Sequence, residues 1–157
     1  MRISADVPTP APAPLRTQLL ALATQFFESG SGVALGARTL RMSDLSGDDW
    51  NARFNEATRQ SSTDWKAAYA ALPTIKTAAA LLGDDPLAIS AREAIAGALG
   101  VANRAFDGMG RAYMAFGRAP VQETAVRTLA MVAYISDQGV DTFDRTALAL
   151  RELALRP

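Results

Sequence analysis

The sequence predicts an all-α protein: a five- to six-helix antiparallel bundle or an orthogonal helical array, built around a long helix near residues 86–117. Apolar residues recur at alternating steps of three and four over most of the chain, which is the spacing of an amphipathic helix. Glycine and proline separate these stretches and mark helix ends. The length of 157 residues suits one domain, and no convincing sheet pattern is present.

At its N-terminus the sequence predicts an extended Pro/Ala-rich arm over residues 1–14, followed by a single helical domain over residues 15–157. The first helix is expected from about 15 to 28, with Gly30 as its stop. Residues 30–47 are loosened by Gly30, Gly32 and Gly36 and predict an ordered loop, with a helical turn within it as an option.

A second helix is expected from about 49 to 72, with a break in its polar middle near Thr58–Asp64 as the alternative. Pro73 is expected to begin a short separate helix that Gly83 stops. Beyond the long helix, Pro120 opens a helix that ends at Gly139 and contains a Glu123–Arg127 pair. Asp141 is expected to cap the last helix.

The long helix is expected to begin at Asp85–Pro86 and to end at Gly117. We expect it to run continuously through Gly108–Gly110, with a break there as the alternative. Three apolar columns repeat every seven residues and make a stripe too wide for a two-helix seam, so neighbours are expected on more than one side. The columns are Ile95, Ala102, Met109 and Phe116; Leu99, Phe106 and Tyr113; and Ala91, Ala98, Ala105 and Ala112. The alanine column would let a second copy approach closely, so a homodimer is compatible with the sequence.

Composition excludes several function classes. The chain contains no cysteine and no histidine, which removes disulfides, His-based zinc sites and the Ser-His-Asp triad. Basic and acidic residues balance at 16 each and are interspersed, so no nucleic-acid groove is expected. No apolar run approaches the roughly 18–20 residues of a transmembrane helix, and no signal peptide is evident, so we expect a cytoplasmic protein.

Two acidic pairs, Asp48–Asp49 and Asp84–Asp85, precede predicted helices. N-capping explains them better than a metal or acid/base site, because neither pair has helical ligand spacing. We therefore expect no catalytic, cofactor or metal site.

The candidate partner-binding residues all lie on the long helix. Phe106, Met109, Tyr113 and Phe116 form an apolar cluster that suits either the core or a partner groove. Arg104 and Arg111 belong to a row that repeats every seven residues to Arg118, which suits either a solvated edge or an acidic partner.

These features favour a non-enzymatic helical protein-binding module: an adaptor, chaperone, immunity-type or regulatory protein. The abundance of alanine, and of arginine over lysine, is typical of GC-rich coding, and we expect a bacterial source. The segment Asn103–Met109 resembles a segment found in phasins, the proteins that coat polyester storage granules. This resemblance implies an amphipathic coat protein as an alternative function. A second alternative is a helical small-ligand-binding protein or enzyme, with Tyr69, Tyr113 or Tyr134 as its polar handle.

Overall fold

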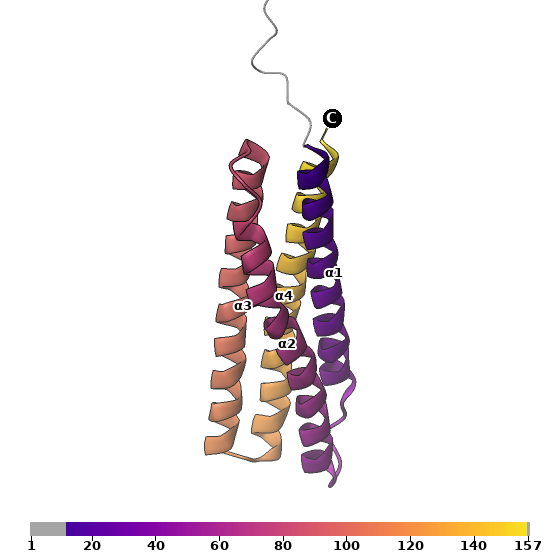
Figure 1. Cartoon of the computed structure of the whole chain (residues 1–157). Helices are drawn as coiled ribbons and strands as arrows, with labels where there is room; N and C mark the ends of the chain where they lie inside the picture. The colour runs from indigo at the N-terminus through magenta and orange to yellow at the C-terminus, as the bar shows by residue number, and fades with distance from the viewer. Residues whose placement is uncertain (1–11, 157) are drawn as a thin grey trace, which may run out of the picture.

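The chain folds as a bundle of four long α-helices. The computed structural model describes residues 12–156. Its helices are α1 (Ala13–Met42), α2 (Trp50–Ala80), α3 (Pro86–Arg118) and α4 (Gln122–Leu155). They alternate in direction, so that α1 begins and α4 ends at the same end of the bundle (Figure 1). The all-α class is confirmed, whereas the expected count of five to six helices is wrong. The arm expected over residues 1–14 lies mostly outside the described residues, and α1 already begins at Ala13.

The helices share one hydrophobic core but pack unevenly. Buried residues from all four helices, with Leu45 from the α1–α2 loop, form a single cluster. Helix α1 packs most extensively against α4, and α3 also packs closely on α4. Helix α2 runs obliquely, from beside α1 at its start to beside α3 at its end (Figure 1). It approaches α1 far more extensively than it approaches α3.

Helix α1 does not stop at Gly30 but continues to Met42, so the loop expected over residues 30–47 is wrong for residues 30–42 and present only from Ser43 onward. Two of its glycines, Gly30 and Gly36, lie where neighbouring helices come close. A Cβ on Gly30 would lie 3.4 Å from the Cβ of Phe143 in α4, and one on Gly36 would lie 3.3 Å from the Cα of Ser61 in α2. Glycine here permits close packing, and the tertiary contacts outweigh its low helix propensity.

Helix α4 also runs through a glycine that was expected to end it. The indole of Trp65 packs against Gly139, where an added Cβ would lie 2.7 Å from the ring atom Cη2. Asp141 therefore caps no new helix, and its carboxylate instead lies 3.1 Å from Nε of Arg145 one turn later. The expected Glu123–Arg127 pair is present at 3.3 Å.

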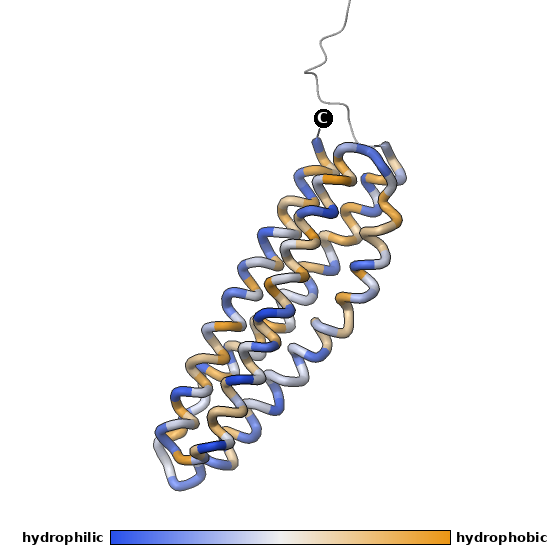
Figure 2. The backbone as a smooth tube through the Cα atoms, turned by 90° about the vertical axis from the view of Figure 1, so that its left-hand side faces the viewer, coloured by the Kyte–Doolittle hydropathy of each residue, from blue (hydrophilic) through white to orange (hydrophobic). Residues whose placement is uncertain are grey.

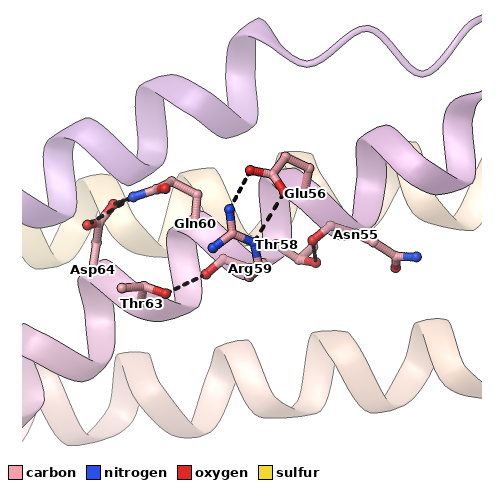
Figure 3. Close-up of polar contacts among 7 residues, drawn as sticks. All are labelled: Asn55, Glu56, Thr58, Arg59, Gln60, Thr63 and Asp64. Carbon is pink, nitrogen blue, oxygen red and sulfur yellow. Dashed lines mark hydrogen bonds and ion pairs between the residues drawn. The ribbon is translucent and has the colours of Figure 1, made fainter.

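Helix α2 is continuous through its polar middle, where a break was the alternative, and through Pro73, where a separate helix was expected to begin. Its polar middle is held by contacts within the helix, among them an Arg59–Glu56 ion pair and a 2.9 Å hydrogen bond from Thr63 to the Arg59 carbonyl (Figure 3). The chain therefore needs no break at Thr58–Asp64. Pro73 lies inside the helix and does not begin a new one. It provides no N–H to the carbonyl of Tyr69, and its ring is exposed.

Helix α3 matches the expected long helix and is continuous through Gly108–Gly110. The carboxylate of Asp85 caps it by accepting a 2.9 Å hydrogen bond from the Leu87 N–H. Ala91, Ala98 and Ala105 of the alanine column are buried within the bundle. A second copy of the chain would therefore have to dock on another surface.

Hydrophilic and hydrophobic residues alternate turn by turn along the helices (Figure 2). Within residues 12–156, no helix combines the length and the apolarity that crossing a bilayer requires.

Candidate functional site

The apolar residues singled out on α3 face α2. Met109 belongs to the core, with 4% of its surface exposed. Phe106 stacks on Tyr69 with ring centroids 4.6 Å apart, and Phe116 contacts Phe54 with centroids 4.2 Å apart. Part of the groove expected for a partner is therefore filled by the chain's own second helix.

Because α2 crosses α3 obliquely, their seam is bridged by large side chains and leaves two hollows. The larger is an open groove of about 600 Å³. Tyr69, Pro73 and Lys76 line it from α2. Ala96, Gly100 and Asn103 line it from α3. The stacked Tyr69–Phe106 pair lies between this groove and the second hollow.

The second hollow, here called the seam pocket, has a volume of about 120 Å³. Its walls come from both helices: Ser61, Ser62, Trp65 and Lys66 of α2, and Phe106, Met109, Gly110 and Tyr113 of α3. It brings together three of the residues singled out from the sequence, Phe106, Met109 and Tyr113. Sequence reasoning missed its α2 wall, because the serines lie in a stretch that reads as solvent-facing.

Two hydroxyl groups at the seam pocket are buried and have no hydrogen-bond partner among the residues that the structure describes. They are Oγ of Ser61, a residue only 1% exposed, and the phenolic oxygen of Tyr113. Burial raises the pKa of Tyr113, and the nearby Ser62 and Ser61 hydroxyls offset this in smaller measure. An unpaired buried hydroxyl costs about 1–3 kcal/mol, so both groups call for a partner that the protein does not supply.

A third surface, here called the α3 outer face, runs along the exposed side of α3 and borders the seam with α2, because Ala96, Gly100 and Asn103 also line the open groove and Gly110 also lines the seam pocket. Its residues follow alternating steps of four and three: Ala96, Gly100, Asn103, Asp107, Gly110, Met114 and Gly117. All but Gly100 are exposed. A Cβ on Gly110 or Gly117 would meet no heavy atom within 4 Å, so the backbone is open to approach there.

Three arginines flank the α3 outer face. Arg104, Arg111 and Arg118 are exposed, and none of them forms an ion pair within residues 12–156. Asp107 is the only carboxylate in the row. The edge of α3 therefore carries cationic side chains whose charge the described part of the chain leaves uncompensated.

The acidic pairs take part in helix starts. Asp85 caps α3, as expected. Asp49 occupies the N-cap position of α2 without a capping hydrogen bond, and its carboxylate accepts a 2.7 Å bond from Arg53, which lowers its pKa. No group of three metal-ligating side chains occurs among the described residues.

A further groove of about 600 Å³ lies where α1 ends and α4 begins. The Gln122 amide donates to the Leu45 carbonyl there, which ties α4 to the α1–α2 loop. It contains neither an unpartnered buried hydroxyl nor a residue singled out from the sequence, so α3 presents the stronger sites.

Comparison of the chain with protein-family models, curated proteins and solved structures gave no match.

Proposed function

We propose that the protein is a non-enzymatic protein-binding module that docks an acidic amphipathic helix of its partner along the α3 outer face. The observation that carries this proposal is the exposed row of small residues flanked by Arg104, Arg111 and Arg118. We further propose a cytoplasmic, bacterial setting, in line with the composition of the chain.

The spacing of the row suits a second helix. Alternating steps of three and four make the seam along which two helices pack in a coiled coil. Residues 96–117 correspond to about 32 Å of helix, which is six turns of contact. The glycines let a partner backbone come close, and Met114 offers a flexible apolar contact.

The arginines give the surface its specificity. Cationic groups at the rim of an interface attract a partner of opposite charge and reject one of like charge. Arginine also pairs with carboxylates in a bidentate geometry. An acidic helix would therefore dock in one register, with carboxylates spaced to meet Arg104, Arg111 and Arg118.

The test is quantitative capture of partners by the tagged full chain from the organism that makes it. The variant Arg104→Glu/Arg111→Glu reverses the charge of the α3 edge. The matched control, Arg16→Glu/Arg151→Glu, makes the same charge change at exposed arginines of α1 and α4 that form no ion pair within the described part of the chain. We expect the first variant to lose a stoichiometric partner by tenfold or more, which corresponds to about 1.4 kcal/mol. We expect the control to retain it. Equal retention by both variants would contradict the proposal.

The coat-protein alternative draws support from the weak α2–α3 packing, because that seam is the easiest to open. The apolar stripes lie inside the closed bundle, so a coat would require the helices to separate on an apolar surface. Binding to polyester granules with a red shift of Trp65 fluorescence, which reports its exposure, would support this function. Absence of granule binding would exclude it.

A further inference from the structure

We propose that the seam pocket between α2 and α3 is a binding site for a neutral, phenol-sized molecule that carries one hydroxyl group. This site lies on the inner side of the seam and goes beyond the docking of a protein helix on the α3 outer face. Four observations carry the proposal: the unpartnered hydroxyls, the apolar walls, the volume and the open approach at Gly110.

The polar end of the pocket is formed by Ser61 and Tyr113. Both hydroxyls are buried and lie near each other, and neither has a hydrogen-bond partner within residues 12–156. A hydroxyl can both donate and accept, so the hydroxyl of a ligand would satisfy the two groups together. The phenol of Tyr113 is in its neutral, donating form at neutral pH, as any tyrosine with its ordinary pKa of about 10 is, and burial raises that pKa further.

The other walls are apolar. Trp65 and Phe106 offer aromatic surfaces, and Met109 offers a polarizable thioether that packs well against aromatic rings. The volume of about 120 Å³ is close to the roughly 150 Å³ of an engineered apolar cavity that binds benzene.

Water fills such a site poorly. A buried water molecule needs two to four polar partners, and the two free hydroxyls satisfy one water at most. The rest of the volume faces apolar walls. A six-membered ring with a single hydroxyl matches both parts.

We expect the ligand to be neutral, because the charged side chain that lines the pocket, Lys66, lies at the rim of the pocket and not beside the buried hydroxyls. Lys66 is exposed and stays solvated, whereas Ser61 is 1% exposed and lies deep. A carboxylate that reached Ser61 would lose its hydration without a buried counter-charge.

Gly110 provides a way to close the site. It lines the pocket, and a Cβ there would meet no heavy atom within 4 Å. Gly110→Leu therefore adds a bulky side chain beside the pocket without a clash at its Cβ. Gly97→Leu is the matched control, since Gly97 lies on the same helix, has the same free space and lines none of the hollows described above.

The experiment is an amide ¹H–¹⁵N NMR titration of the full chain with p-cresol, toluene and benzoate. We expect p-cresol to shift the signals of Ser61, Trp65 and Gly110 saturably, with toluene bound about fivefold more weakly because it lacks one hydrogen bond. Tighter binding of benzoate would show an anion site and overturn the neutral class. The absence of saturable shifts would mean that water alone fills the pocket, and would overturn the proposal.

Variants assign the binding to the pocket. Gly110→Leu should weaken p-cresol binding by tenfold or more, and Gly97→Leu should leave it unchanged. Ser61→Ala should weaken it about fivefold, which keeps the test valid if Gly110→Leu fails to fold. Equal effects of Gly110→Leu and Gly97→Leu would contradict the assignment. The Arg104→Glu/Arg111→Glu variant should bind p-cresol normally, so failure of this site and failure of the protein-docking surface are separately visible.

Discussion

Trp65 joins α2 to the rest of the bundle. Its indole Nε1 donates a 2.8 Å hydrogen bond to Oγ of Ser136 in α4, and its ring packs on Gly139 and lies 6.4 Å from the ring of Phe143. Only 2% of its surface is exposed, so it is a core residue. Its partners were not predictable, because they lie 71 residues or more away along the chain.

Loss of the Ser136 hydroxyl should destabilise the fold. In Ser136→Ala the buried indole N–H of Trp65 loses its acceptor, so we expect the free energy of unfolding to fall by about 1–3 kcal/mol in urea titrations. Ser31→Ala, at an exposed position of α1, should be neutral or slightly stabilising. An unchanged midpoint for Ser136→Ala would show that the hydrogen bond contributes nothing.

Glycines in the helices should respond to alanine in opposite ways. Gly139→Ala should destabilise by about 1–3 kcal/mol because its Cβ would overlap the Trp65 ring. Gly32→Ala, where a Cβ would have free space, should stabilise by roughly 0.5–1 kcal/mol through helix propensity. Thermal and urea unfolding of the two variants measures whether each substitution raises or lowers the free energy of unfolding. Destabilisation by both would mean that α1 is not helical at Gly32.

Tyr113 should make the fold sensitive to alkali. Its pKa is raised in the folded state, so the folded state holds the proton more tightly than the unfolded chain does. This contribution is complete below the ordinary tyrosine pKa of about 10 and is lost as the pH rises through the folded value. Between pH 9 and 11 the unfolding free energy of the wild type should therefore fall more steeply than that of Tyr113→Phe. The exposed control Tyr134→Phe should follow the wild type, and identical slopes for all three would refute the effect.

At the level of the helix, α2 departs most from a regular, uniformly packed element. Its middle is polar, it contains Pro73, and it crosses α3 obliquely. Local side-chain bonds and the anchoring of Trp65 on α4 keep it helical. The seam with α3 is therefore where the bundle leaves space.

Pro73 should cost stability where it stands. An internal proline removes one helical hydrogen bond and costs about 3 kcal/mol relative to alanine, and the exposed ring loses little packing on replacement. Pro73→Ala should therefore raise the unfolding free energy, by up to about 3 kcal/mol. The neighbouring Thr74→Ala should change it by less than about 0.7 kcal/mol. A decrease for Pro73→Ala would show that the fold depends on a bend at this residue.

The sequence predicted element type better than element ends. Apolar spacing indicated the helical class and located α3 with its Asp85 cap. It failed at Gly30, Gly139 and Pro73, because a local rule reads these residues as helix boundaries, whereas the packing of distant helices decides whether a helix ends or begins there. Glycine at a close helix contact and glycine at a helix end look alike in sequence.

At the scale of the whole molecule, the arrangement of the helices decides which of the candidate partner-binding residues are exposed and which are packed against other helices. Phe106, Tyr113 and Phe116 face α2, Met109 lies in the core, and Arg104 and Arg111 remain exposed. The sequence could not distinguish these positions, since which face of α3 meets α2 depends on how the four helices are placed. The seam pocket and the α3 outer face both follow from the oblique path of α2.

The central claim, that α3 presents the docking surface, is tested most directly by photo-crosslinking in the cells that make the protein. A photoreactive amino acid replaces either Met114 on the α3 outer face or Tyr134 on α4, two positions of matched exposure at 62% and 60%. We expect the photoreactive amino acid at position 114 to trap one specific protein in a discrete adduct, and the one at position 134 to trap none. Equal trapping at both positions, or trapping at Tyr134 alone, would contradict the central claim.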